Sequence, residues 1–338
     1  MSILRRRTRA TAQDVPAPRP KPASAAELPH PRWVEPTDDP AHSAVTDAAA
    51  TRDWPTLREA LARYRADDLS ELIESLCHES MAELDAWLPA ALGAQHEDAL
   101  ARTVLGAYTV AKAWEVRTRK PAWKVSPEQL RRFRELLRLA EQYLLDAAVI
   151  DPGDSAPRYF LLVSGRGLDA DTAELMHRFE LVIARAPGHR GAHDQMLQGL
   201  CRKWHGSHEA MFDFARAAMR GPDAGKLGSL VAQAHIELWT YRGRDEEAYR
   251  LMRTDETRAE LLNAAELSLF RPEHRSLRRP YKDANAFAAV LSIAEMWPQA
   301  WRAFEAADGV INGYWVLVDR ENPYTAYVEA RATALANS

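Results

Sequence analysis

The sequence predicts an all-α protein in which helix pairs stack into an α-solenoid, with irregular helices on either side of the stack. Pro152, Pro187 and Pro222 lie 35 residues apart, and each follows one apolar segment with helical spacing and precedes another. At the same offset large apolar residues fall in register, as Trp204 does with Trp239. A repeat of this length with recurring core positions indicates tandem helix pairs that share one apolar core.

Composition limits the classes of partner. The 338 residues are 46% hydrophobic, and 44 Lys plus Arg stand against 48 Asp plus Glu, for a net charge of -4. This balance gives no overall attraction to nucleic acid or to an anionic membrane, so a nucleic-acid partner is unexpected. No stretch of about 18 apolar residues occurs, so no membrane insertion is expected.

The two cysteines, Cys77 and Cys201, both lie in apolar segments with helical spacing. A thiol in such a place behaves as a small hydrophobic group, and two cysteines make a disulfide framework unexpected. The sequence therefore favours a reducing, cytoplasmic location.

Residues 1–51 are rich in proline, alanine and charged residues and contain few large apolar side chains. Burial there is too small to offset the entropy of ordering the backbone, which predicts a disordered leader. Its first residues include a basic cluster, which either contacts an acidic partner or is a solvated run: Arg5, Arg6, Arg7 and Arg9.

An N-terminal helical region is expected over 52–150. Asp53 and Pro55 mark its first helix start, and a capping box of Ser126 with Gln129 marks the start of its last helix. Apolar residues at three- and four-residue spacing predict the intervening helices. The expected helices begin at Asp53, at Asp67 or Asp68, at Met81, at Glu97 and at Ser126, and the last two end near Arg117 and Ile150.

The paired repeats are expected over 151–256, with turn residues between the members of each pair. First members are predicted at 156–164, 190–204 and 227–242, and second members at 171–186, 207–220 and 245–253. A C-terminal helical region follows over 257–338, with helices at 257–270, 285–296, 298–307 and 323–336. Residues 314–318 suit a strand as well as a helix, and helix or irregular structure is preferred because a single strand has no evident partner.

A family resemblance is carried by the Asp151-Pro152 and Ala186-Pro187 helix ends, the pair period and three alanines of the second helices, Ala173, Ala210 and Ala248. These features resemble tetratricopeptide repeats. The segment Lys203–Arg216 more narrowly resembles an uncharacterised actinobacterial family of helical-repeat proteins, and the similarity covers about residues 145–255. The resemblance implies a partner-binding scaffold and implies no chemistry.

Candidate partner-binding residues are the polar side chains on the first helices, because that side lines the concave surface of a solenoid. Such groups can hydrogen-bond a peptide backbone or its carboxylates; the alternative is a solvated helix face without a ligand. Trp204 is expected in the core. The candidates are Gln195, Gln198, Arg202, Lys203, Gln233 and Glu237.

Other signatures point away from chemistry. His189 and His193 have the four-residue spacing that can hold a metal, but capping or surface roles are preferred. Gly165-Arg166-Gly167 lacks the third glycine of a dinucleotide loop, and His208-Glu209 lacks the second histidine of a zinc-protease helix. No catalytic residue, metal or cofactor is therefore predicted.

One basic segment remains. It can contact phosphate or an acidic peptide, although a solvated loop is the preferred interpretation. Its members are Arg271, Arg275, Arg278, Arg279 and Lys282.

These observations predict a cytoplasmic protein-interaction scaffold or adaptor that binds a peptide or partner helix in a concave groove. The alternative is an enzyme or small-ligand sensor with a pocket between helices. An open polar groove favours the scaffold, whereas a convergent cluster of buried carboxylates and histidines with shifted pKa values favours the alternative. A nucleic-acid binder acting through the basic segment is a third possibility.

Overall fold

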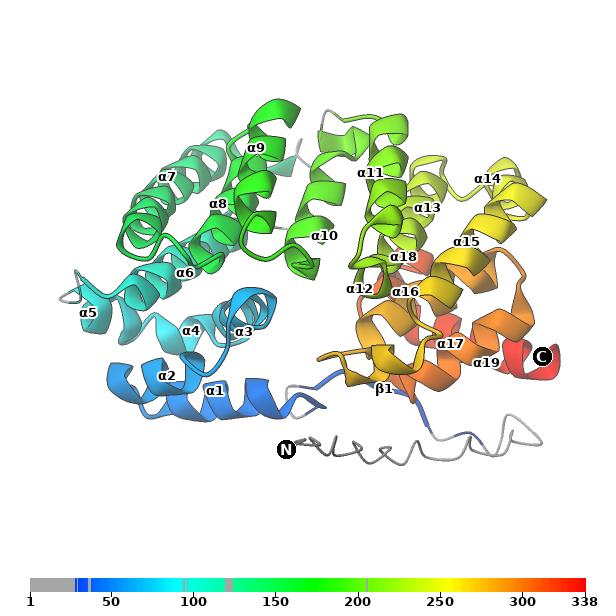
Figure 1. Ribbon diagram of the computed structural model, residues 1–338, viewed down its shortest axis with the longest axis horizontal. Coiled ribbons are helices and arrows are strands. Elements are labelled where there is room, and N and C mark those ends of the chain that lie inside the picture. The colour runs from blue at the N-terminus through cyan, green and yellow to red at the C-terminus, as the bar shows by residue number, and fades with distance from the viewer. Residues whose placement is uncertain are drawn as a thin grey trace, which may run out of the picture.

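Helices make up most of the computed structural model, which describes residues 28, 30–35, 38–93, 95, 97–118, 124–204 and 206–338 (Figure 1). The all-α prediction is therefore confirmed. Strands are confined, within these residues, to β1 (Arg32–Trp33) and β2 (Val310–Ile311). Over the same ranges, no helix combines the length and apolarity that crossing a membrane requires.

The N-terminal helices begin where short polar residues cap them. Asp39, Asp53 and Asp98 each accept a hydrogen bond from a backbone N–H of the first turn, and Ser126 with Gln129 forms the predicted capping box. The helices are α1 (Pro40–Ala50), α2 (Trp54–Leu61), α3 (Ala66–Glu79), α4 (Met81–Leu84), α5 (Leu88–Gly93), α6 (Ala99–Arg117) and α7 (Pro127–Ile150).

Helix α1 corrects the boundary of the expected disordered leader. Residues 1–51 were expected to lack structure, yet Pro40–Ala50 are helical. Asp39 caps this helix, and Val45, which is fully buried, lies on the side that packs against α2 and α3. Small residues suffice here because neighbouring helices supply the burial. Residues 1–27, with the basic cluster, lie outside the described residues.

The six helices predicted over 151–256 are present in the structure. They are α8 (Ala156–Gly167), α9 (Thr172–Ile183), α10 (Arg190–Gly199), α11 (His208–Arg220), α13 (Ser229–Tyr241) and α14 (Glu246–Met252), with the short elements η4 (Arg202–Trp204) and α12 (Ala224–Leu227). Neighbours in this order pack on one another, α8 on α9, α9 on α10 and α11 on α13.

The predicted equivalence of Trp204 and Trp239 is wrong. Trp239 lies inside α13, is buried and packs against Tyr249 at 5.4 Å between ring centroids. Trp204 is only partly buried and packs against Trp114 of α6, with 6.2 Å between the ring centroids. Because α10 ends at Gly199, the chain turns into η4 and carries Trp204 away from the position that α13 gives to Trp239.

The C-terminal region contains α15 (Asp255–Leu267), η5 (Pro272–Ser276), α16 (Tyr281–Ile293), α17 (Trp297–Ala307), α18 (Tyr314–Val318) and α19 (Pro323–Ala336). The preferred helical reading of 314–318 is confirmed. Trp315 of α18 is fully buried and donates a hydrogen bond from Nε1 to Asn285 Oδ1 of α16 at 2.9 Å.

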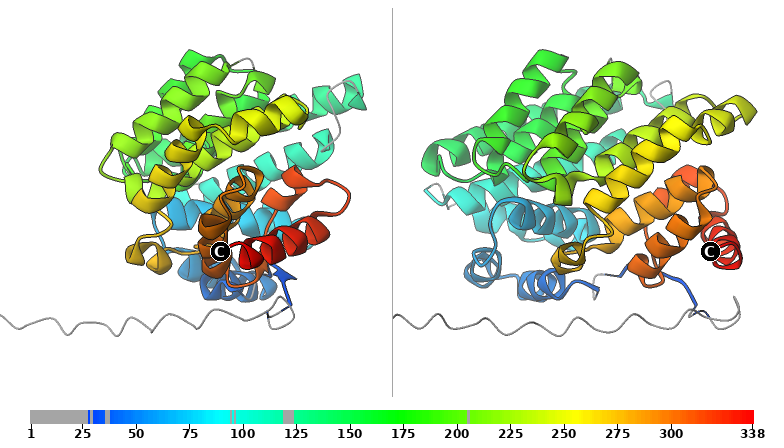
Figure 2. Two further views of the ribbon diagram at one scale, coloured as in Figure 1. Left: turned by 90° about the vertical axis from the view of Figure 1, so that its right-hand side faces the viewer. Right: turned by 45° about the vertical axis from the view of Figure 1, so that its right-hand side comes forward.

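Segments near the start and near the end of the described chain meet. β1 pairs in parallel with β2, with Arg32 opposite Val310 and Trp33 opposite Ile311. Helices α1–α3 and α16–α19 lie on the same side of the layer of α8–α14 (Figure 2). The layer of α8–α14, which carries the candidate binding residues, therefore lies against helices from both the N-terminal and the C-terminal regions.

Candidate binding site

The candidate residues of α10 and α13 contact one another. Gln198 Nε2 donates to Glu237 at 2.9 Å, and Lys203 Nζ lies 2.7 Å from the same carboxylate. Gln233 Nε2 donates to Asp194 at 2.8 Å. The structure thus brings Gln198, Lys203 and Glu237 together and links Gln233 to a carboxylate that the sequence analysis missed.

The other two candidates differ. Gln195 is partly buried, and its Oε1 is sealed from solvent without a hydrogen-bond partner. Arg202 is exposed, with its guanidinium 5.3 Å from the centre of the Tyr241 ring. Arg202 therefore stands apart from the group around Glu237.

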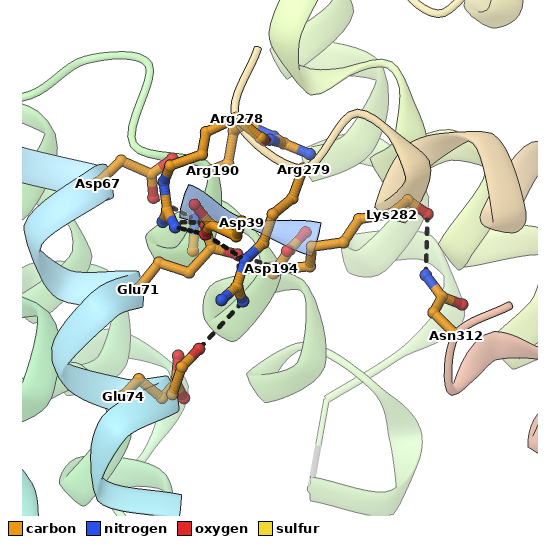
Figure 3. A network of polar contacts seen from close by, with 12 residues as sticks. Asp39, Asp67, Glu71, Glu74, Arg190, Asp194, Arg278, Arg279, Lys282 and Asn312 are labelled. Carbon is orange, nitrogen blue, oxygen red and sulfur yellow. Dashed lines mark hydrogen bonds and ion pairs between the residues drawn. The ribbon is translucent and has the colours of Figure 1, made fainter. Parts of the chain in front are cut away.

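The basic segment meets acidic partners from the N-terminal helices (Figure 3). Arg278 pairs with Asp39 and Glu71 and lies 3.0 Å from Asp68, while Arg279 Nε lies 2.8 Å from Asp39. Lys282 Nζ lies 3.1 Å from Glu71. We call this group the closure network; its members are Asp39, Asp68, Glu71, Arg278, Arg279 and Lys282.

The closure network overturns the solvated-loop interpretation for Arg278 and Arg279. Arg278 and Arg279 have side chains only 15% and 13% exposed, and Asp39 is 3% exposed. Arg271 and Arg275 do remain exposed. The acidic partner that the sequence allowed for this segment lies in the same chain, and nothing local in the sequence identified it.

Charge shifts the pKa values inside this network. Burial alone raises the pKa of Asp39, but Arg278 and Arg279 outweigh burial and hold it below its usual value. The pKa of Glu71 is lowered in the same way, because Lys282, Arg278 and Arg279 outweigh its burial. Both carboxylates are therefore held ionised by their partners.

A second set of polar contacts fixes the start of α10. Arg190 Nη2 lies 2.8 Å from Asp283 of α16, and Nη1 donates to the Arg278 carbonyl at 3.3 Å. On the other side, the Gly191 N–H donates to Asp67 of α3 at 3.0 Å. The start of α10 is thus tied to both ends of the chain.

His189 and His193 make hydrogen bonds that hold the start of α10. His189 is the N-cap residue of α10, with Nε2 3.2 Å from Ser70 Oγ, and His193 Nδ1 donates to the His189 carbonyl at 2.9 Å. Across the described ranges, no three His, Cys, Asp or Glu side chains gather in a way that could hold a metal ion.

Asp194 has a pKa suited to proton exchange near neutral pH. Burial raises its pKa to about 6, although Lys282, Gln233 and Arg190 act in the opposite direction. Tyr314 of α18 also faces this charge, and burial raises its pKa well above the usual value. Asp194 therefore lies at the centre of a polar interior bounded by α10, α13, α16 and α18.

A pocket of about 710 Å³ opens beside this interior. Lys282 belongs both to the pocket wall and to the closure network. One wall comes from the N-terminal part of the chain and the other from α16, α18 and the segment before α18. Lining residues include Val34, His42, Tyr281, Lys282, Tyr314 and Leu317.

No protein-family model matches this chain, and comparison with curated proteins also gave no match. The site is therefore interpreted from its own geometry.

Proposed function

We propose that this protein is a partner-binding module in which tetratricopeptide-like pairs from α8 to α14 form a short solenoid, and a segment of a partner polypeptide enters the 710 Å³ pocket. The pocket carries this proposal, because elements from the two ends of the chain build it together. A preformed pocket of this kind binds without a further ordering cost.

The surroundings of the pocket suit an extended polypeptide. Val34 follows β1 and lines the pocket, and β1 has a strand partner, among the residues described, on one side only. Trp33 and Val34 are 40% and 37% exposed. An open strand edge beside exposed apolar side chains is a surface to which an extended segment can add.

The pairing of the candidate residues moves the proposed contact away from an open groove. Gln198 and Lys203 already bind Glu237, and Gln233 already binds Asp194. A partner that displaced the Gln233–Asp194 contact would leave a buried amide unpaired, which costs about 1–3 kcal/mol. We therefore place the partner in the pocket and assign these residues to holding α10 and α13 together.

Binding of a small ligand is the second candidate, and two observations favour it. The pocket volume lies within the range of about 300–1,000 Å³ that is usual for small-molecule sites. Carboxylates and histidines with shifted pKa values converge nearby, among them Asp194, Glu71 and His42, whose pKa burial lowers.

A peptide-display selection on the purified full chain tests the proposal. Selected peptides should lose about tenfold or more in affinity, equivalent to 1.4 kcal/mol, when Val34→Arg or Leu317→Arg places a charge in the pocket. Val149→Arg is the matched control, because Val149 lies in α7 and is 78% exposed.

Equal loss in all three variants, or none in the pocket variants, contradicts the proposal. If no peptide is selected, but small molecules raise the melting temperature of the wild type and of Val149→Arg and not of the pocket variants, the second candidate replaces the first.

A further inference from the structure

Arg166 is a partly buried cation without an acidic partner. It lies in the last turn of α8, and its Nε is sealed from solvent and makes no hydrogen bond. No carboxylate of the described residues forms an ion pair with it. Arg178 and Arg190, whose side chains are 19% and 14% exposed, contrast with it because both are paired with carboxylates.

Two tryptophans define the surroundings of this guanidinium. Its central carbon lies 5.5 Å from the ring centre of Trp114 in α6 and 5.4 Å from that of Trp204 in η4. The two indoles meet edge to face at 87°, so they enclose the cation on two sides. Cation–π contacts of this kind are favourable, yet they supply no hydrogen-bond acceptor.

The guanidinium therefore keeps unused donors. Arginine stays charged in proteins and presents a planar fork of N–H groups that matches the two oxygens of a carboxylate or phosphate. Nε is the only atom of Arg166 that is both sealed from solvent and unpaired, and no described residue accepts from the terminal nitrogens. A ligand oxyanion would give the terminal N–H groups partners in a partly dry place, where charge-assisted hydrogen bonds are strong.

Groups of both charges lie near Arg166. Burial lowers the pKa of Arg166, and Tyr159, Glu74 and Cys201 offset this effect only in part. Burial raises the pKa of Cys201 to about 12 and Glu237 acts in the same direction, whereas Lys203 and Arg166 act to lower it, which places the two cations and this carboxylate in one neighbourhood. Lys203 is 48% exposed at its side chain.

We infer that Arg166, framed by Trp114 and Trp204, is a binding site for an oxyanion, either a carboxylate or a phosphate group, of a ligand. This site is separate from the pocket at Val34 and Leu317 and does not depend on the proposed function.

Fluorine NMR of the full chain labelled with 5-fluorotryptophan tests the inference. The variants Trp114→Phe and Trp204→Phe assign the two resonances among the ten tryptophans. Sodium phosphate and sodium acetate are titrated separately, with sodium chloride holding the ionic strength constant. We expect saturable shifts of both resonances with at least one of the two anions, and the tighter anion identifies the class of ligand.

Arg166→Gln should weaken this binding at least about tenfold, and Arg166→Lys, which keeps the charge without the fork, should weaken it less. Arg202→Gln is the matched control and should bind like the wild type. Equal affinity in Arg166→Lys and wild type overturns the inference even if Arg166→Gln fails to fold. A wild type that shows only the drift produced by chloride also overturns it.

Discussion

Arg278 donates a hydrogen bond to Glu71, a residue 207 positions earlier in the chain. The same guanidinium also pairs with Asp39 and Asp68, so one side chain contacts α3 and the residue that caps α1. This relationship joins the N-terminal helices to the start of α16. It therefore holds in place both walls of the pocket that we propose as the binding site.

Replacing Arg278 with leucine should destabilise the protein by about 3 kcal/mol, because removing one partner of a buried ion pair leaves the other charges uncompensated. Urea unfolding followed by circular dichroism measures the change. Arg275→Leu is the matched control, since Arg275 is exposed in the same segment, and it should change the free energy of unfolding by less than about 0.5 kcal/mol. Similar effects of the two substitutions would mean that the closure network does not stabilise the fold.

Asp194→Asn should stabilise the protein at pH 7.5 and have little effect near pH 4. The folded-state pKa of about 6 exceeds that of an unfolded aspartate, about 3.9, so the folded state binds this proton more tightly. Between these pH values the unfolded chain releases the proton first, and the free energy of unfolding falls as pH rises. Above pH 6 the loss is complete.

Asparagine stays neutral and avoids that loss, which we expect to be on the order of 3 kcal/mol. Thermal unfolding at pH 4, 5, 6 and 7.5 measures the difference, and Asp213→Asn on the exposed face of α11 is the control. A variant that is less stable than the wild type at pH 7.5 would show that Asp194 is needed as an anion.

Asn285→Ala should cost about 3 kcal/mol or more and loosen α18. Asn285 is fully buried; its Nδ2 donates to the carbonyls of Tyr281 and Val310, and its Oδ1 accepts from Trp315. Removing the amide leaves a buried indole N–H and the Val310 carbonyl without partners. Compared with the wild type, the variant should show a larger increase in the rate of hydrogen exchange in 310–318 than in α7. An equal change in the two segments would contradict this role.

Gly206→Ala should destabilise the turn between η4 and α11 by about 2 kcal/mol, since a Cβ there would lie 2.0 Å from the backbone oxygen of Leu200. The backbone at Leu200 cannot move without shifting the end of α10. Gly93→Ala is the control, because a Cβ at Gly93 meets nothing within 4 Å. Differential scanning calorimetry distinguishes the two, and equal melting temperatures would count against the tight turn.

Most helices could be predicted from local sequence signals. The capping box at Ser126 and the cap at Asp53 act within one turn of the chain, and the structure confirms each as a cap. The helix over 314–318 was preferred for want of a strand partner, and it is α18. Such features are visible because their physical causes lie within a few residues.

The features that were missed depend on partners far away in the sequence. Helix α1 has few large apolar residues and is buried by α2 and α3. The pairing of β1 with β2 joins residues 32–33 to residues 310–311, and Arg278 finds its carboxylates at 39, 68 and 71. Neither the acidic start of α3 nor the basic segment before α16 identifies the other as its partner.

The pocket could not be predicted for the same reason. Gln198 and Glu237 were proposed as partner-binding residues, and in the structure they contact each other. Asp194, Tyr314 and Lys282 were not brought together by sequence reasoning, because α18 and α16 approach α10 only in the folded chain.

A double-mutant cycle between Glu71→Gln and Arg278→Met measures whether the contact between α3 and the segment before α16 stabilises the fold. Urea unfolding of the wild type, the two single variants and the double variant gives the coupling free energy. We expect a favourable coupling of about 2 kcal/mol, as found for residues in one buried ion network. Single-variant effects that add to within about 0.5 kcal/mol would contradict it.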